Sequence, residues 1–217
     1  MKFILFIEGQ TERILPVFLK RWLDPQLSRP IGIKPICFKG NDNYLAEVEK
    51  RAALYLRQQD VIAIIGLLDL YGLNWPDYLN TPRERYDWAK QDLEKRVGHP
   101  KFRQFFAVHE LEAWLLSDPD IFPTPLKTAL RSAASNPEAV NSEQPPAKLL
   151  SKLYREKLKA GSGRVEYKKT VDGSELFRKL DPAIAYQKCP CLKELFDEML
   201  RLAQAGGPPV EEEAWEA

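Results

Sequence analysis

The sequence has few of the residues that build most structural metal centres and disulfide frameworks. Among its 217 residues are three cysteines and two histidines. A structural zinc site takes about four Cys or His ligands at regular spacing, and no such set is present. An odd number of cysteines, with no secretory leader at the start, predicts a reducing compartment. We therefore expect a cytoplasmic protein.

The sequence also lacks an excess of charge of one sign and a long hydrophobic run. It carries 32 basic and 31 acidic residues, for a net charge of +1. This balance gives no global argument for a nucleic-acid or membrane partner, although it can hide a local basic face. The longest apolar run, Val61–Leu68, is far shorter than the ~20 residues of a membrane helix. We expect no membrane partner.

Strand-like and helix-like segments alternate through the first half of the chain. Strands are predicted over Phe3–Ile7, Ile31–Phe38, Val61–Leu68 and Lys101–Val108, and the first is apolar on both faces, as in a buried strand. Helical spacing is found over Gln10–Leu23, Tyr44–Gln59 and Pro82–Val97. The third strand is the most hydrophobic and so is expected in the centre, whereas Pro35 favours an edge position for the second. The alternation predicts an α/β fold, with a mainly parallel four-stranded sheet flanked by helices.

The character of the sequence changes after Asp118. Prolines interrupt short helical segments, and no further strand signal follows. We therefore predict an α/β domain over residues 1–118 and a helical C-terminal subdomain packed on it over 119–205. The segment 206–217 is acidic and rich in Pro and Gly, which predicts a disordered tail.

Acidic residues follow three of the predicted strands. Glu8 follows the first, Asp69 the third, and Glu110 and Glu112 the fourth. The carboxyl ends of parallel strands meet at one edge of a sheet, where ligands bind. Crowded carboxylates repel one another, and a bound Mg²⁺ or Mn²⁺ would remove the penalty. The pattern predicts a metal site, although Asp69 alone fits a helix N-cap equally well.

Glu110 and Glu112 leave an alternative open. They stand two residues apart in a stretch with helical spacing, "HELEAWLL". On a helix, residues at this separation point to different sides, so only one of them need face the site. His109, just before them, fits a structural role, a general base or a ligand.

The order "FIEGQTE", "LLDLYGL", "HELEAWLLSDP" resembles the TOPRIM superfamily. In that superfamily a glutamate follows the first strand, an acidic motif follows the third, and further acidic residues bind divalent metal. TOPRIM domains occur in topoisomerases, primases and the overcoming-lysogenization-defect nucleases. Here Asp69-Leu70-Tyr71 stands where the superfamily has a DxD motif.

A closer resemblance, over nearly the whole chain, is to a bacterial TOPRIM-like family known as domain of unknown function 4276. Its pattern is E-G-x-T-E, D-x-Y-G, H-E-x-E-A, P-x-K, Y-x-K-x-x-x-G and C-P. These motifs occur in that order at Glu8–Glu12, Asp69–Gly72, His109–Ala113, Pro146–Lys148, Tyr167–Gly173 and Cys189–Pro190. Related TOPRIM-like proteins work beside ATPases in bacterial defence against phage, and the resemblance implies such a setting here.

The residues and the resemblance together predict a divalent-metal-dependent nuclease acting on DNA or RNA with an ATPase partner. The metal ligands, for Mg²⁺ or Mn²⁺, are Glu8, Asp69, Glu110 and Glu112. The catalytic residues are Glu8, Asp69, Glu112 and Lys169, of which Lys169 would contact the phosphate.

The alternative is a non-catalytic regulatory or sensor subunit of an ATPase-containing defence complex. The near-neutral charge favours it, because a free-standing nuclease usually carries a basic groove. The sequence is compatible with a homodimer.

Overall fold

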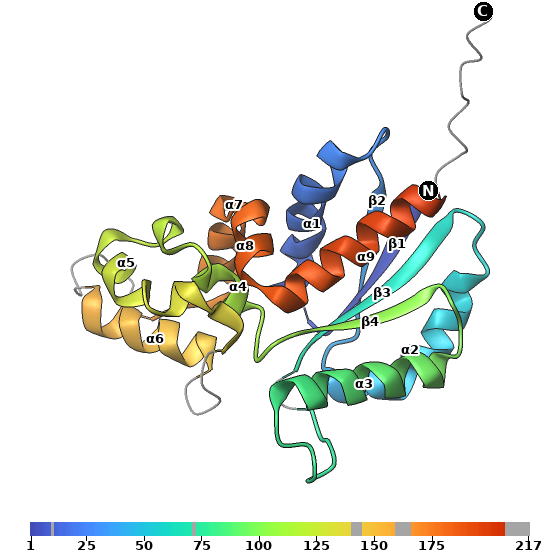
Figure 1. Ribbon diagram of the computed structural model, residues 1–217, viewed down its shortest axis with the longest axis horizontal. Helices are drawn as coiled ribbons and strands as arrows, with labels where there is room; N and C mark the ends of the chain where they lie inside the picture. Colours follow the sequence, from blue (N-terminus) through green and yellow to red (C-terminus); the bar gives the residue numbers. More distant parts are fainter. Residues whose placement is uncertain (10, 71–72, 140–144, 159–165, 207–217) are drawn as a thin grey trace, which may run out of the picture.

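The fold is built on a sheet of four parallel strands. The structure, a computed structural model, describes residues 1–9, 11–70, 73–139, 145–158 and 166–206. The strands are β1 (Lys2–Ile7), β2 (Gly32–Cys37), β3 (Val61–Asp69) and β4 (Phe102–Ala107). Their order is β2-β1-β3-β4 and every neighbouring pair is parallel (Figure 1). The predicted fold class is confirmed, with β3 inside the sheet and the Pro35 strand at its edge.

The connections through the first half are helical. They are η1 (Thr11–Ile14), α1 (Leu15–Leu23), η2 (Asp24–Gln26), α2 (Asn41–Leu56) and α3 (Pro82–Val97). The helix expected from Gln10 is wrong in its first part, because a 3₁₀ turn comes first and the α-helix begins at Leu15. Pro16 lies in the first turn of α1, where its missing N–H costs no helix hydrogen bond. Gln10 itself lies outside the described residues.

Helices, most of them short, make up the described part of the second half. They are α4 (Glu112–Leu116), η3 (Pro119–Ile121), α5 (Thr124–Leu130), η4 (Ala133–Ser135), η5 (Pro137–Ala139), α6 (Pro146–Lys157), the π-helical turn η7 (Lys169–Gly173), α7 (Ser174–Lys179), α8 (Pro182–Lys188) and α9 (Pro190–Gly206). None of the described helices is both long and apolar enough to cross a bilayer. The boundaries proposed at residues 118 and 205 stay predictions, and 207–217 of the expected tail lie outside the described part.

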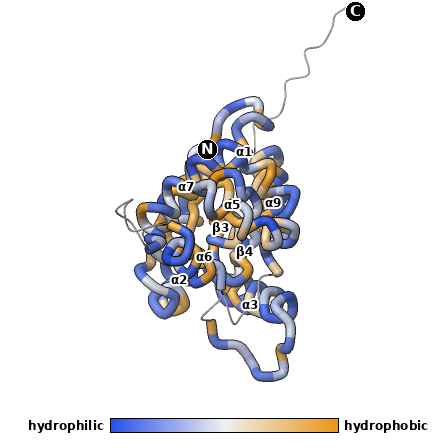
Figure 2. The backbone as a smooth tube through the Cα atoms, turned by 90° about the vertical axis from the view of Figure 1, so that its left-hand side faces the viewer, coloured by the Kyte–Doolittle hydropathy of each residue, from blue (hydrophilic) through white to orange (hydrophobic). Residues whose placement is uncertain are grey.

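The two faces of the sheet carry separate hydrophobic cores. Alternate side chains of a strand point to opposite faces. Leu5 and Ile7 of β1 therefore join the core shared with α1 and α9, whereas Ile4 and Phe6 join the core shared with α2 and α3. Figure 2 shows the hydrophobic segments gathered in the middle of the molecule. The continuous apolar runs in the sequence are explained by this coverage on both faces.

The helices α4 to α8 lie beyond the carboxyl ends of β3 and β4 (Figure 1). The chain then returns, and α9 packs on β3 and β4 beside α1, where the rings of Trp22 and Phe196 stack 4.4 Å apart. The buried carboxylate of Glu138 accepts hydrogen bonds from the backbone N–H of Cys191, at 2.7 Å, and of Leu192, at 3.3 Å. The C-P motif thus begins α9, and Glu138 caps it.

A glycine in β3 makes room for a polar contact across the sheet. The Tyr44 hydroxyl, from α2, donates a 2.7 Å hydrogen bond to Oε1 of Gln104, from β4. Both groups are fully buried, and a Cβ at Gly66 would overlap both of them. Gly66 is therefore needed for its lack of a side chain.

Candidate functional site

Two of the predicted site residues lie at the carboxyl edge of adjacent strands. In the β1–β3 register Ile7 pairs with Leu67. Glu8 follows β1 directly, and Asp69 is the last residue of β3. The sheet therefore brings both residues to the same edge, as the sequence predicts for parallel strands.

Asp69 holds the segment that follows β4. Its Oδ1 accepts a 3.0 Å hydrogen bond from the backbone N–H of Leu111. The chain turns sharply just before, where His109 has a φ of 66°, in the left-handed region that non-glycine residues seldom occupy. This turn places Glu110 ahead of α4 and Glu112 at its first residue.

Lys169 brings Glu110 and Glu112 together. Its Nζ lies 3.1 Å from Oε1 of Glu110 and 3.2 Å from Oε2 of Glu112. The two carboxylate side chains are only 12% and 7% exposed, whereas the Lys169 side chain is 38% exposed, so the ion pairs are shielded from water mainly on the carboxylate side. Helical spacing would have sent the two carboxylates apart, but Glu110 lies before the first residue of α4 and so is not on the helix. Both carboxylates can therefore face the same lysine.

The carboxylates keep Lys169 protonated. Burial on its own lowers the pKa of Lys169, but Glu112, Asp69 and Glu110 together outweigh it and raise the pKa above the usual lysine value. Burial raises the pKa of Glu112, with Lys169 opposing and Glu110 reinforcing the shift. The site thus holds a charged lysine against a carboxylate with increased proton affinity.

Tyr167 and Gly173 explain the rest of the Y-x-K-x-x-x-G motif. The Tyr167 hydroxyl donates to Oε1 of Glu112 at 3.2 Å, and a Cβ at Gly173 would lie 2.8 Å from that hydroxyl. The turn between them is closed by Asp172, whose Oδ2 accepts from the backbone N–H of Lys168 at 2.7 Å. The motif therefore positions one tyrosine and one lysine against Glu112.

Helix α6 also begins at the site. The backbone N–H of Ala147, in the first turn of α6, donates to Oε2 of Glu110 at 2.9 Å. A carboxylate at a helix N-terminus satisfies an otherwise unpaired N–H and is stabilised by the helix dipole. The P-x-K motif thus contributes a backbone donor, while the Lys148 side chain is exposed to solvent.

His109 is half-buried, and burial lowers its pKa although Glu110 opposes the shift. Its structural contribution is the left-handed turn.

Tyr71 and Gly72 of the D-x-Y-G motif lie outside the described residues. Sequence reasoning missed Tyr167 and Ala147 as partners of the glutamates, and the motifs that contain them were the one available signal.

The oxygen ligands of the site suit a divalent ion in part. Within the described residues no group of three His, Cys, Asp or Glu side chains is placed to share an ion, and Glu110 and Glu112 both form ion pairs with Lys169. Mg²⁺ is often bound through one or two carboxylates plus substrate phosphates. Glu8 and Asp69, from adjacent strand ends, stay the predicted pair, and Glu110 and Glu112 would have to give up contacts with Lys169 to bind an ion.

The raised pKa of Glu112 gives a prediction for stability against pH. The folded state holds this proton up to a higher pH than the unfolded state, so ionising Glu112 costs stability as the pH rises. Glu112→Gln removes that cost. The free energy of unfolding of the variant, relative to wild type, should therefore rise as the pH increases above the ordinary glutamate range, measured by urea denaturation. Glu175→Gln, at an exposed position of α7, is the control. A relative stability that falls with pH would contradict the assignment.

Comparison with known proteins gives one family and one similar fold. The model of the family described as "Domain of unknown function (DUF4276)" matches residues 7–200. No curated protein matches the sequence at a significant level. Among solved structures, the C-terminal region of the Burkholderia pseudomallei OLD protein is similar, with 17% sequence identity and a TM-score of 0.46. The match covers 94% of this chain and 98% of that one.

Proposed function

Since this chain belongs to the DUF4276 family, whose match runs from the end of β1 into α9, we propose that it is a divalent-metal-dependent nuclease cleaving phosphodiester bonds of DNA or RNA. The observation that carries the proposal is the meeting of Lys169 with Asp69, Glu110 and Glu112 at the carboxyl edge of the sheet. The TOPRIM-like order of motifs supports the same reaction. It also supports a setting in bacterial defence with an ATPase partner.

Each residue has a proposed role. Glu8 and Asp69 are the candidate ligands for Mg²⁺ or Mn²⁺, which when bound would polarise the phosphate and lower the pKa of a bound water. Lys169, protonated at neutral pH, would contact a phosphate oxygen and stabilise the developing negative charge. Glu112 has increased proton affinity and so is suited to take the proton from the attacking water.

Phosphate binding and ion pairing compete for Lys169. Its ammonium group already has two carboxylate partners, so a phosphate oxygen must share the lysine or replace one of them. Tyr167 and the Ala147 N–H would hold Glu112 and Glu110 in place during this exchange. Removing the lysine should then impair phosphate binding and the chemical step together.

A second function, a non-catalytic regulatory or sensor subunit, is favoured by one observation. The ion pairs of Lys169 connect η7 of the helical part to the segment after β4. Lys169, Glu110 and Glu112 therefore already hold these two parts of the fold together. In this case the carboxylates would be kept for folding, and an ATPase partner would carry the activity.

A cleavage assay distinguishes the two functions. Purified protein, alone and with any ATPase encoded beside it, is incubated with single- and double-stranded DNA and RNA in Mg²⁺, Mn²⁺ or EDTA. We expect cleavage only with metal, and a loss of roughly 100-fold or more in Glu8→Gln and Asp69→Asn. Glu175→Gln should cleave as wild type does. Cleavage that persists in EDTA, or no cleavage under any condition, would overturn the nuclease proposal, and the latter would support the subunit function.

A further inference from the structure

Helix α6 carries a row of basic residues on its outer face. Lys148, Lys152 and Arg155 follow one another at intervals of four and three residues, which places them along one side of a helix. All three are exposed, whereas Leu150, Leu153 and Tyr154 of the same helix are buried on the opposite side. The three side chains, here called the α6 stripe, span about 10 Å along the axis.

The stripe differs from the charged faces of the other long helices. In α2, α3 and α9, basic residues pair with acidic residues one turn away. These pairs are Arg51–Glu47, Arg83–Asp87 and Lys193–Asp197. In the described part of the chain no carboxylate forms an ion pair with a residue of the α6 stripe. Glu156 is the one acidic residue of α6. The stripe is therefore a concentrated positive charge in a protein whose net charge is +1.

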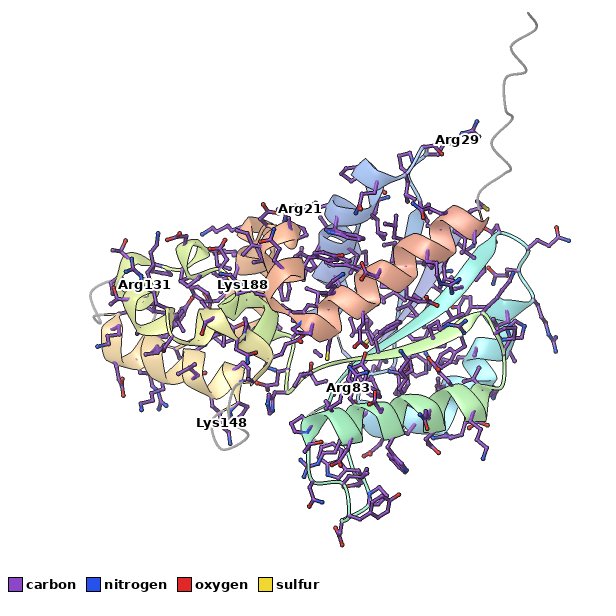
Figure 3. All side chains as sticks on the ribbon, viewed as in Figure 1. Arg21, Arg29, Arg83, Arg131, Lys148 and Lys188 are labelled. Atoms are coloured by element: carbon purple, nitrogen blue, oxygen red, sulfur yellow. The ribbon has the colours of Figure 1, made fainter. Side chains whose placement is uncertain are left out.

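The stripe begins next to the candidate site. Ala147, whose N–H binds Glu110, directly precedes Lys148. Figure 3 shows Lys148 at the end of α6 that lies toward the sheet, and the helix runs away from that point. A linear anion bound along the stripe would thus have one end close to Glu110 and Lys169.

We infer that the α6 stripe binds the phosphodiester backbone of a nucleic-acid strand and guides it to the carboxyl edge of the sheet. Three exposed cations in a row suit a linear polyanion better than a single phosphate group. A membrane surface fits less well, because interfacial helices also present apolar side chains and no exposed large hydrophobic residue lies on α6. The inference rests on the proposed function for its substrate class and adds the route by which the strand reaches the site.

Salt-dependent binding tests the inference. The variant Lys148→Gln/Lys152→Gln/Arg155→Gln is compared with Arg29→Gln/Lys50→Gln/Arg57→Gln, which removes the same charge from exposed positions. Arg29 lies far from α6 (Figure 3). Fluorescence anisotropy follows binding of a labelled mixed-sequence single-stranded DNA in EDTA at several salt concentrations, after circular dichroism has shown that both variants are folded.

The stripe variant should bind at least tenfold more weakly at low salt. Its slope of log K against log salt should be smaller by about 2, since each lost phosphate contact removes about 0.7, and the control variant should match wild type. Equal binding by both variants, or no binding by wild type, would overturn the inference. So would binding to phosphatidylserine vesicles but not to DNA.

The inference and the nuclease proposal can fail separately. If wild type binds DNA through the stripe but cleaves nothing with Mg²⁺ or Mn²⁺, the inference stands and the nuclease proposal fails. If wild type cleaves DNA and the stripe variant cleaves it with an unchanged KM, the nuclease proposal stands and the inference fails.

Discussion

Replacing Lys169 with methionine is expected to lower the free energy of unfolding by about 2–3 kcal/mol at neutral pH. The change leaves Glu110 and Glu112 without their shared cation, and their side chains are only 12% and 7% exposed. Breaking a fully buried ion pair costs about 3–5 kcal/mol. The Lys169 side chain is itself 38% exposed, so solvent screening reduces the expected loss. Nuclease activity, where it is found, should be lost as well.

The pH dependence of the free energy of unfolding of Lys169→Met identifies the cause of its lower stability. Without Lys169 nothing offsets the burial that already raises the pKa of Glu112, so the folded state will keep that proton to a still higher pH. The instability should therefore be largest at neutral pH and shrink as the pH falls through the raised pKa. Urea denaturation between about pH 5 and 8 measures this.

Two further variants complete this test. Lys169→Met/Glu112→Gln should recover much of the lost stability, because no buried carboxylate is then left unpaired at position 112. Lys168→Met, at the exposed neighbouring position, should resemble wild type. If Lys169→Met is as stable as Lys168→Met at neutral pH, the two ion pairs contribute little and the electrostatic account of the site is wrong.

Gly66→Ala is expected to destabilise the protein by about 2–6 kcal/mol. A Cβ at this position meets both the Tyr44 hydroxyl and Oε1 of Gln104. Overpacking a core costs about 1–3 kcal/mol, and separating the buried Tyr44–Gln104 hydrogen bond adds a penalty of about 1–3 kcal/mol. Thermal and urea unfolding measure the effect.

A second strand glycine provides the control for Gly66→Ala. Gly32 lies in the edge strand β2, where a Cβ would come no closer than 3.2 Å to the Cβ of Lys2. Gly32→Ala should therefore cost much less than Gly66→Ala. Tyr44→Phe in the Gly66→Ala protein should restore part of the loss, because it removes one of the two overlapping atoms. Equal effects of the two glycine substitutions would contradict the explanation.

The strands could be predicted from the sequence because β1 and β3 are short, continuous apolar runs and the other two are short segments between helical patterns, and no observed end differs from the predicted one by more than one residue. The order of the elements also sufficed to bring Glu8 and Asp69 to one edge. The relation between Glu110 and Glu112 could not be read in this way. It depends on the start of α4 at Glu112, which leaves Glu110 outside the helix, and the helical spacing of this segment carries no signal for the residue at which the helix begins.

Long-range contacts limited the prediction elsewhere. Glu138 caps a helix that begins more than fifty residues later in the chain, and Tyr167 reaches Glu112 across a similar separation. Neither pairing follows from local spacing. The roles of Glu8, Asp69, Glu112 and Lys169 in catalysis stay predictions, as does the binding of Mg²⁺ or Mn²⁺.

The position of α9 has a consequence for synthesis of the chain on the ribosome. This helix covers one face of β3 and β4, yet it begins at Pro190, long after β4 ends at Ala107. At a translation rate of about 5–20 residues per second, roughly 5–20 s pass between the synthesis of β4 and the synthesis of α9. Phe105 and Ile65, which belong to the core on this face, stay exposed in the nascent chain during that interval. Binding by chaperones should therefore be strongest for nascent chains that end between β4 and α9, and should fall once α9 has emerged.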